Sequence, residues 1–543
     1  MIAASRFPSP DRHRHWALAA FGVIVLVAAV LRLYQLGDNP PGLFCDEASI
    51  QYDAYLVLHT GADRWGVHLP FYFKSFGDYE SPLFIYVSMP FVALMGLNPI
   101  ADRLEAALFG IGAVALLYPL AMELFRRRDA ALLSTAVLAI SSWHILYSHV
   151  AFEAISMPFF YVLAPYLFLA ALRRRHTLLY YGSFVAWGLS LYTYHVPRLE
   201  TPVFLGCMLL IYYRDLLRWK RPTMIGIAIF VVLSIPLGIS ILTGEATARF
   251  SLIGVFSQGL HGWALVSALY NNYIQHYSIW FLFIFGSTPG DPVLRGYIMG
   301  MGALYWTQFP FLLVGMAGLL ARRDRTTLFV LACLFLVYPI GGTLTSGGAE
   351  VRDMFGVVPF SVITGYGLAL SWRWLRTAAP RPRWQPSVTA GGLVIGIALL
   401  AISLTQLWSL FFVNYERASA GYWGWQGGPA EIIAYFKKVE PRYDDLLMTG
   451  LFNEPEIFFP IYAQTGCERC GVGGLAQYNP ARRQLFAMRP EEMVAGWRYT
   501  IHHTVRFGDG TVGYQIVEAK PISAAVASHD RLSDNVSDKR RVR

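Results

Sequence analysis

Two acidic residues stand side by side just after the first strongly apolar run of the chain. Asp46 and Glu47 follow residues 16–35, most of which are apolar. A carboxylate held beside a membrane surface can act as a general base that takes a proton from an acceptor hydroxyl. The pair could equally be solvated loop residues or a helix N-cap, and the residues alone leave both interpretations open.

A third carboxylate interrupts another apolar stretch. Glu153 ends the run Ser148-His149-Val150-Ala151-Phe152-Glu153, and apolar residues continue after it. An ionisable side chain in such a stretch is a functional candidate by default, although an interfacial residue that reaches water is the alternative. We therefore predict that Asp46, Glu47 and Glu153 are catalytic.

Basic and polar groups near these carboxylates are the candidates for binding a phosphate. Before the C-terminal segment, the parts of the chain that we expect on the outer side of the membrane have few basic residues, and arginine can bind phosphate through two hydrogen bonds. Anchoring at the membrane surface is the alternative for each of them. The predicted substrate- or phosphate-binding residues are Lys74, Asp78, Glu80, Arg103, His149, His195, Arg198, Glu350 and Arg352.

The composition indicates a membrane protein. Of the 543 residues, 55% are hydrophobic and only 15% are charged, whereas a soluble domain carries about 25% charged residues. The net charge of +9 comes in short clusters between apolar runs. That pattern indicates membrane topology and argues against nucleic-acid binding.

The apolar runs predict eleven membrane spans, each close to the length of about 20 residues that a bilayer requires. They are 16–35, 104–125, 130–150, 154–172, 178–196, 200–217, 223–243, 302–321, 326–345, 356–375 and 388–412.

A further apolar run, 81–97, decides the orientation. If it does not cross, the arginine clusters at 126–128, 173–175, 214–221, 322–325 and 373–383 all lie on the same side as the N-terminus; if it crosses, every one of them lies on the opposite side. The positive-inside rule makes the side of the clusters cytoplasmic. We therefore predict an interfacial or re-entrant helix at 81–97 and a cytoplasmic N-terminus, 1–15. The membrane module is 16–412, with outer loops at 36–103 and 244–301.

The remaining residues differ in composition. An amphipathic helix at 431–439 and strands at 445–450 and 511–518 predict a small extracytoplasmic α/β domain within 413–520. Cys467 and Cys470 form a single C-x-x-C with no second pair, which argues against a zinc knuckle. If the segment lies outside the membrane, we expect a local disulfide between them. Residues 521–543 are polar and charged, and we expect them to be disordered.

The side on which the carboxylates lie points to a type of donor. Nucleotide sugars are made in the cytoplasm and are too charged to cross a bilayer unaided. A sugar transferase that faces outward therefore needs a lipid-borne donor, whose phosphate lies at the headgroup level.

Several of these segments match one known family. The matching features are Asp46-Glu47, Glu80-Ser81-Pro82-Leu83, Gly96-Leu97-Asn98, the stretch 103–110, and Ser141-Ser142-Trp143-His144 leading to Glu153. They resemble GT-C fold glycosyltransferases of the protein O-mannosyltransferase and aminoarabinose-transferase type, glycosyltransferase family 39 and its relatives. The resemblance covers about 16–200 well, and 200–415 in hydropathy only.

The resemblance implies an all-α polytopic membrane protein of the GT-C type, with about eleven transmembrane helices and outer interfacial helices. It does not extend to the C-terminal segment, where the sequence pattern alone predicts the small α/β domain. The resemblance also implies inverting transfer of a sugar from a polyprenyl-phosphate donor, with Asp46 as the catalytic carboxylate and Glu47 as its companion. The acceptor is a hydroxyl of a lipid, a glycan or a protein. Relatives often have Lys-Pro-Pro where this chain has Glu80-Ser81-Pro82, which leaves the acceptor open.

Two other functions remain open. A transporter or flippase for lipid-linked sugars would use the same outer cavity without chemistry. A glycan ligase or polymerase with a pyrophosphate-linked donor would place its chemistry in loop 244–301, at residues such as His261 and His276. Metal use varies within the superfamily, so a divalent metal ion is a possible cofactor, although the sequence shows no dedicated metal cage.

Overall fold

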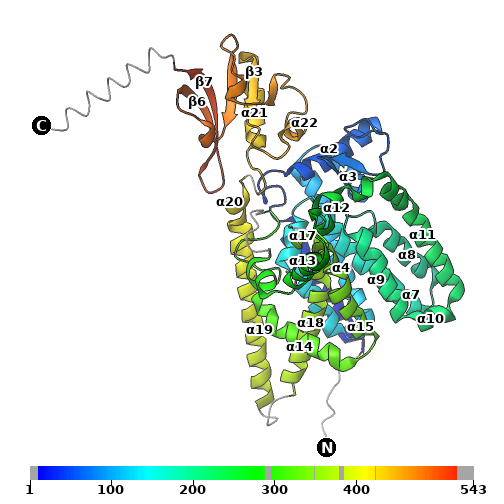
Figure 1. Ribbon diagram of the computed structural model, residues 1–543. Coiled ribbons are helices and arrows are strands. Elements are labelled where there is room, and N and C mark those ends of the chain that lie inside the picture. Colours follow the sequence, from blue (N-terminus) through cyan, green and yellow to red (C-terminus); the bar gives the residue numbers. More distant parts are fainter. Residues whose placement is uncertain are drawn as a thin grey trace, which may run out of the picture. The chain divides into compact units, whose positions relative to one another are not determined.

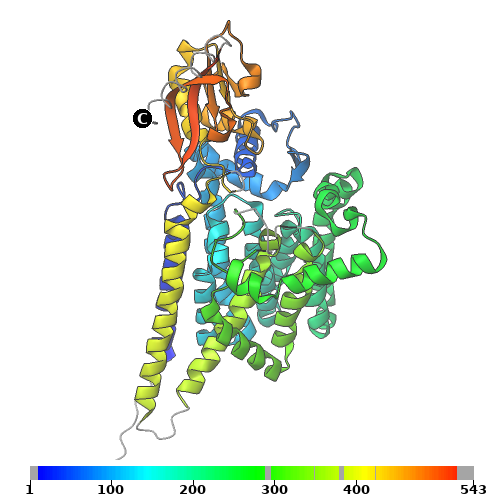
Figure 2. The same ribbon diagram turned by 60° about the vertical axis from the view of Figure 1, so that its left-hand side comes forward.

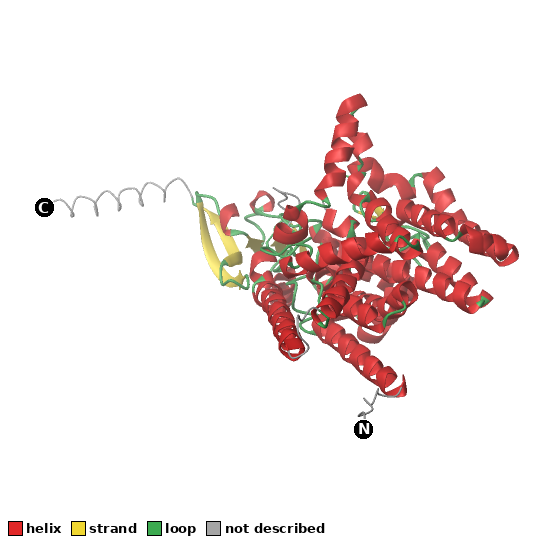
Figure 3. Ribbon diagram, turned by 90° about the horizontal axis from the view of Figure 1, so that it is seen from below, coloured by secondary structure: helices red, strands yellow, loops and turns green. Residues whose placement is uncertain are grey.

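The computed structural model describes residues 10–287, 295–345, 347, 349–377, 384–421 and 424–522, with side chains for all of these except 10–14 and 349. The chain divides into two compact units. The larger contains residues up to 40 together with 49–416, and the smaller contains 41–48 together with the residues from 417 onward. Helices dominate the molecule, and its strands gather mainly in the smaller unit (Figure 3).

The larger unit is a bundle of helices (Figure 1). Its helices are α1 (Pro10–Leu33), α2 (Cys45–Thr60, which begins in the smaller unit), α3 (Pro82–Met95), α4 (Pro99–Phe125), α5 (Arg128–Ala139), α6 (Ser142–Ser148), α7 (Ser156–Arg174), α8 (Thr177–Ser190), α9 (Pro197–Ile211), α10 (Tyr213–Arg218), α11 (Lys220–Thr243), α12 (Ala248–Ile253), α13 (Gly262–Gln275), α14 (Phe309–Arg322), α15 (Arg325–Ala332), α16 (Ile340–Thr343), α17 (Ala349–Arg352), α18 (Val357–Leu375), α19 (Gln385–Leu407) and α20 (Tyr415–Ser419).

The bundle is that of a multi-pass membrane protein. Among the described residues, seven helices are long and apolar enough to cross a membrane, or eight if the bent pair α5–α6 is one span. The seven are His15–Leu33, Pro99–Phe125, Glu153–Arg174, Lys220–Thr243, Arg325–Thr343, Met354–Leu375 and Gln385–Val413. The span that contains α19 stands at one edge of the bundle (Figure 2) and is only 6% buried within the protein, as expected for a helix that faces lipid.

Three predicted spans are shorter helices than the apolar pattern indicates. The segments at 178–196, 200–217 and 302–321 form α8, α9 and α14, of 14, 15 and 14 residues. At a rise of 1.5 Å per residue, each is only about 21–23 Å long. The chain turns out of helix before Pro197 and before Phe309 although its apolar composition continues. Helix α3 also has only 14 residues and is too short to count among these candidate spans; that 81–97 does not cross the membrane stays a prediction.

The bent span is stabilised by a buried arginine. Helices α5 and α6 meet at an angle of 56°, and the side chain of Arg32 lies in the break. It donates to the carbonyls of Ala139 at 2.8 Å and Leu138 at 3.2 Å, and it lies 2.7 Å from Nδ1 of His144. Tyr305 donates to the next carbonyl, that of Ile140, at 2.7 Å. Carbonyls freed by a helix break at membrane depth need such partners.

The smaller unit contains a five-stranded mixed sheet in the order β4-β3-β5-β7-β6. Strands β3 (Asp445–Met448), β4 (Cys470–Val472) and β5 (Gln484–Met488) are parallel, and β7 (Val512–Pro521) and β6 (Trp497–Arg506) extend the sheet antiparallel. The helices of this unit are α21 (Pro429–Val439) and α22 (Phe458–Tyr462). The predicted α/β architecture is confirmed. Its boundaries stay a prediction, and the predicted tail lies, from residue 523 onward, outside the described residues.

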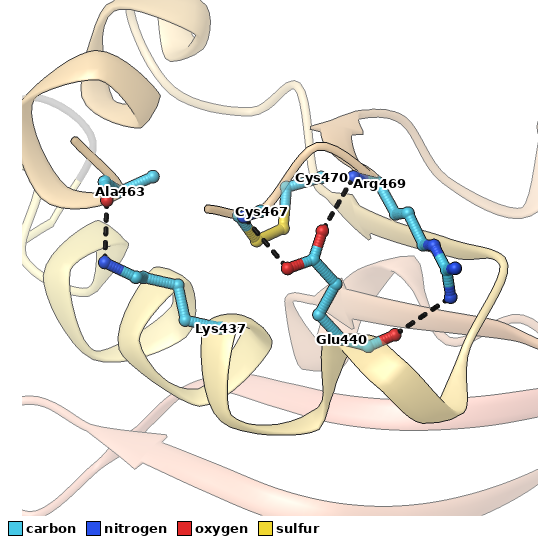
Figure 4. The surroundings of a disulfide bond; sticks show 6 residues. All are labelled: Lys437, Glu440, Ala463, Cys467, Arg469 and Cys470. Atoms are coloured by element: carbon cyan, nitrogen blue, oxygen red, sulfur yellow. Dashed lines mark hydrogen bonds between the residues drawn. A yellow bond between two sulfur atoms is a disulfide. The ribbon is translucent and has the colours of Figure 1, made fainter. Parts of the chain in front are cut away.

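The two cysteines of the C-x-x-C form a disulfide, as predicted. Figure 4 shows its surroundings: the carboxylate of Glu440 accepts the backbone N–H of Cys467 at 2.9 Å and that of Arg469 at 3.0 Å. The disulfide loop is thereby attached to the end of α21, where the side chain of Lys437 donates to the carbonyl of Ala463 at 2.6 Å.

Candidate functional site

A short hairpin and the start of α7 bring two of the predicted carboxylates together. Strands β1 (Phe73–Ser75) and β2 (Asp78–Glu80) pair antiparallel, so Glu80 ends the hairpin directly before α3. Glu80 accepts a hydrogen bond from the hydroxyl of Ser49 at 2.5 Å. Glu153, which is buried, accepts the backbone N–H of the next residue, Ser81. The two carboxylates are thus attached to neighbouring residues of one chain segment.

Arg198 lies beside this pair. It is in the first turn of α9, and its guanidinium group donates to the hydroxyl of Ser81 at 3.0 Å and to the carbonyl of Ala246 at 2.5 Å. The same group lies 4.7 Å from the centre of the Tyr72 ring, as in a cation–π contact. Arg198 therefore joins the hairpin, α9 and the segment that follows α11.

Three arginines gather around His195. Burial and the nearby charges of Arg198, Arg249 and Arg352 together lower the pKa of the His195 ring. Arg249 comes from α12, and its guanidinium lies 3.5 Å from the carboxylate of Asp78 on the hairpin. Each arginine comes from a different part of the sequence, so only the fold assembles them.

Arg352 is the most buried of the three arginines. It donates to the hydroxyl of Thr345 at 3.0 Å and to the carbonyl of Gly347. Burial lowers the pKa of Arg352, and the neighbouring charge of Arg249 adds to the shift. Positive guanidinium groups that lie near one another are stabilised by an anion among them, and phosphate suits their fork of N–H donors.

The loop after α11 contacts several parts of this group. Its Ala246 carbonyl accepts from Arg198, and its Arg249 pairs with Asp78. Farther on, the backbone N–H of Val255 donates to the carbonyl of Leu344 at 3.0 Å, just before the residues that bind Arg352. We call the group of Asp78, Glu80, Glu153, His195, Arg198, Arg249 and Arg352 the polar cluster.

Other predicted binding residues lie elsewhere or make other contacts. Lys74 lies on β1, with its amine 4.9 Å from the centre of the Trp65 ring. Glu350 is buried, and its backbone carbonyl accepts the indole N–H of Trp143 at 2.8 Å. Its side chain fills the space where a Cβ on Gly296 would lie, 2.0 Å from that position.

Arg103 and His149 contact backbone carbonyls. Arg103 is buried in the first turns of α4 and donates to the carbonyls of Pro40 at 2.9 Å and Leu36 at 3.4 Å. The ring nitrogens of His149 lie 2.9 Å from the carbonyl of Ile145 and 3.1 Å from that of Tyr34. These contacts fit a structural role, and the predicted binding role of both residues stays a prediction.

Asp46 and Glu47 open α2 and belong to the smaller unit. The Glu47 side chain is buried and accepts the backbone N–H of Phe44 at 3.0 Å, a contact that caps the helix. Asp46 is half-buried and accepts a weak hydrogen bond from the thiol of Cys45 at 3.5 Å. The more accessible of the two is thus the residue predicted as the base.

Two further groups were not chosen from the sequence. Arg249 was not selected from the sequence, because only its pairing with Asp78 distinguishes it. His276 and Asp353 form a buried pair, 2.5 Å apart, although His276 was considered only for the ligase alternative. Gly342 is packed against both, and a Cβ there would lie 2.3 Å from the imidazole.

In the part of the chain that the structure describes, no group of three or more His, Cys, Asp or Glu side chains is placed to hold a metal ion. The polar cluster supplies arginines that can bind an anion and carboxylates that can accept a proton.

Neither a protein-family model nor a curated protein matches the sequence. Solved structures match the fold. The archaeal oligosaccharyltransferase AglB from Archaeoglobus fulgidus, in complex with an inhibitory peptide and a dolichol-phosphate, is 14% identical; the match covers 94% of this chain and 77% of that one, with a TM-score of 0.54.

A second match is ArnT from Cupriavidus metallidurans bound to undecaprenyl phosphate. It is 16% identical, and the match covers 92% of this chain and 98% of that one, with a TM-score of 0.51. In the apo form of the Archaeoglobus fulgidus oligosaccharyltransferase, the match covers 85% of this chain but only 65% of that one, at 13% identity and a TM-score of 0.55. At these identities the likeness shows the fold, which is the predicted GT-C type.

Proposed function

We propose that the protein is a membrane glycosyltransferase that moves a sugar from a polyprenyl-phosphate donor to an acceptor hydroxyl. The observation that carries the proposal is the polar cluster, in which three arginines from separate segments gather beside two carboxylates. Two proteins with a similar fold are described with a dolichol-phosphate and with undecaprenyl phosphate bound. A lipid-borne phosphate is therefore the anion that we assign to Arg198, Arg249 and Arg352.

The proposed reaction is a single displacement. The acceptor oxygen attacks the anomeric carbon from the face opposite the phosphate and forms the new glycosidic bond. The bond between that carbon and the phosphate oxygen breaks, and the lipid phosphate leaves with the electron pair. Arginines aimed at the departing phosphate stabilise the charge that develops there. The acceptor proton passes to a carboxylate, which we assign to Asp46 with Glu153 as the second candidate.

The orientation is part of the proposal. A cytoplasmic N-terminus follows from the arginine clusters at 126–128, 173–175, 214–221 and 322–325. The Cys467–Cys470 disulfide supports an extracytoplasmic position for the smaller unit, because disulfides persist in oxidising compartments. The reaction then takes place on the outer face of the cell membrane.

The test is transfer from radiolabelled polyprenyl-phosphate sugars by the purified protein in proteoliposomes. Replacing Arg198 or Arg352 with glutamine removes hydrogen bonds to a charged group, each worth about 1.5–3 kcal/mol. We expect kcat/KM for the donor to fall by about 10- to 100-fold. The matched control is Arg214→Gln, an exposed arginine of α10 that contacts Tyr213, and it leaves kcat/KM unchanged.

Three outcomes contradict the proposal. Unchanged kcat/KM in both cluster variants excludes these arginines as phosphate ligands. Donor that is bound and moved across the bilayer without release of the sugar supports the transporter alternative. Transfer from a pyrophosphate-linked donor alone supports the ligase alternative.

A further inference from the structure

The loop between α2 and β1 directs a run of apolar side chains outward. Trp65, Val67, Leu69 and Phe71 are 56%, 51%, 68% and 43% exposed. We call residues 65–71 the apolar loop. Contiguous apolar surface of this kind marks an interaction site rather than an ordinary solvent-exposed loop.

The backbone of the loop holds these side chains in place. The side chain of Asp63 accepts the backbone N–H groups of Trp65 and Val67, each at 2.9 Å. The N–H of Leu69 donates to the carbonyl of Gly61 at 3.0 Å. Leu69 itself has a φ of 42°, which residues other than glycine adopt rarely. The loop is therefore fixed in a conformation that keeps its apolar side chains away from the protein.

Packing against α11 sets the position of the loop. Tyr72 belongs to a buried cluster with Tyr192 and Leu237, and the ring of Phe71 lies 5.1 Å from that of Tyr192. Leu237 is near the C-terminal end of α11, a candidate membrane span that is only 17% buried within the protein. The last turn of the same helix exposes Leu242. The apolar loop thus continues the lipid-facing surface of α11.

The other side of the loop contacts α3. The hydroxyl of Tyr86 donates to the carbonyl of Pro70 at 2.8 Å, and the end of α3 exposes Leu94. The indole N–H of Trp65 donates to the carbonyl of Lys74 at 2.7 Å, while the Lys74 amine lies over the Trp65 ring. A tryptophan with an apolar face and a polar contact is typical of the boundary between lipid chains and headgroups.

We propose that the apolar loop inserts into the lipid leaflet around the C-terminal end of α11. The partner is the bilayer itself, because the loop continues the surface of a membrane-spanning helix. Insertion anchors β1 and β2, which follow the loop directly, near the headgroups. The proposal stands independently of the catalytic function.

The test measures the surroundings of a spin label at Leu69 by electron paramagnetic resonance. The full chain, with the half-buried Cys207 replaced by alanine, is reconstituted into nanodiscs of phosphatidylcholine and phosphatidylglycerol. Leu69→Cys is compared with two other exposed leucines: Leu242→Cys on α11, and Leu451→Cys in the smaller unit, which are 88% and 46% exposed. Collisions with oxygen, which concentrates in lipid, and with a nickel chelate, which stays in water, are measured for each label.

We expect the label at residue 69 to behave as that at residue 242, with high access to oxygen and low access to the nickel chelate. Access to the chelate equal to that at residue 451 overturns the proposal. Low access to both reagents places protein over the loop and overturns it as well. Val67→Cys provides a second position in the same loop, in case the variant at Leu69 fails to fold.

Discussion

Replacing Arg32 with methionine removes the group that fills the break between α5 and α6. Arg32 is fully buried, and its guanidinium contacts the carbonyls of Leu138 and Ala139 and the ring of His144. The Leu138 carbonyl keeps a partner, because the backbone N–H of Ser141 also donates to it at 3.2 Å. The Ala139 carbonyl and His144 lose the contact.

The size of the effect follows from these contacts. A buried polar group that loses its hydrogen bond costs about 1–3 kcal/mol, and two groups are affected. Removal of a buried charge offsets part of that cost. We therefore expect the free energy of unfolding to fall by about 2 kcal/mol, with a midpoint of thermal unfolding lowered by about 2 °C for a chain of this length.

The assay is thermal unfolding of the purified protein in detergent, followed by tryptophan fluorescence. Arg32→Lys keeps the positive charge but not the fork of donors, so its midpoint lies between those of Arg32→Met and the wild type. Arg214→Met, at an exposed arginine, provides the control. A wild-type midpoint for Arg32→Met, combined with loss of donor binding, refutes the structural role and makes Arg32 a phosphate ligand.

Three further predictions test other parts of the structure. Arg249→Gln weakens donor binding by about 10-fold, because one charge-assisted hydrogen bond is lost. Asp78→Asn releases Arg249 from its ion pair and strengthens donor binding by about two- to fivefold. If both variants change donor binding equally and in the same direction, this pairing is contradicted. Burial raises the pKa of Asp53 to about 6. The folded protein therefore holds this proton more tightly than the unfolded chain, where the pKa is about 3.9. As a result, the free energy of unfolding falls by about 3 kcal/mol as the pH rises from about 4 to about 6. Asp53→Asn removes this dependence of stability on pH, which is measured by thermal unfolding over that pH range. A membrane-impermeant maleimide labels Cys467 and Cys470 in intact cells only after reduction, and labelling that requires permeabilised cells contradicts the proposed orientation.

Apolar runs and arginine clusters were sufficient to predict a helical, multi-pass membrane protein, while the orientation and the prediction that α3 does not span stay predictions. The apolar runs did not locate the ends of α8, α9 and α14, because apolar residues continue through the turns that end or precede these helices. Hydropathy records composition, whereas the end of a helix depends on backbone hydrogen bonds that tertiary contacts decide.

The small sheet was predicted only in part, for a similar reason. The strands at 445–450 and 511–518 have recognisable patterns, and the structure contains β3 and β7 there. Strand β6 is largely exposed and has no regular alternation, while β4 has only three residues. Such strands form because their neighbours offer backbone partners, which the local sequence does not reveal.

The sequence predicted most residues of the candidate site but not how they lie relative to one another. Glu153, Glu80, Asp78, His195, Arg198 and Arg352 were all chosen from the sequence, and the structure brings them together in the polar cluster. Arg249 was passed over because its role depends on Asp78, which is distant in the sequence. Arg103 lies in a stretch that resembles the family, yet in the fold its guanidinium donates to the backbone carbonyls of Leu36 and Pro40.

The most direct test of the central claim is the release of lipid phosphate by the wild-type protein. Purified protein in proteoliposomes is given a polyprenyl-phosphate sugar labelled in both the sugar and the phosphate, together with extracts that supply lipid, glycan and protein acceptors. The proposed function predicts that labelled sugar enters an acceptor as an equal amount of free polyprenyl phosphate appears, and that Asp46→Asn abolishes both. Intact donor that crosses the bilayer with neither product formed contradicts it.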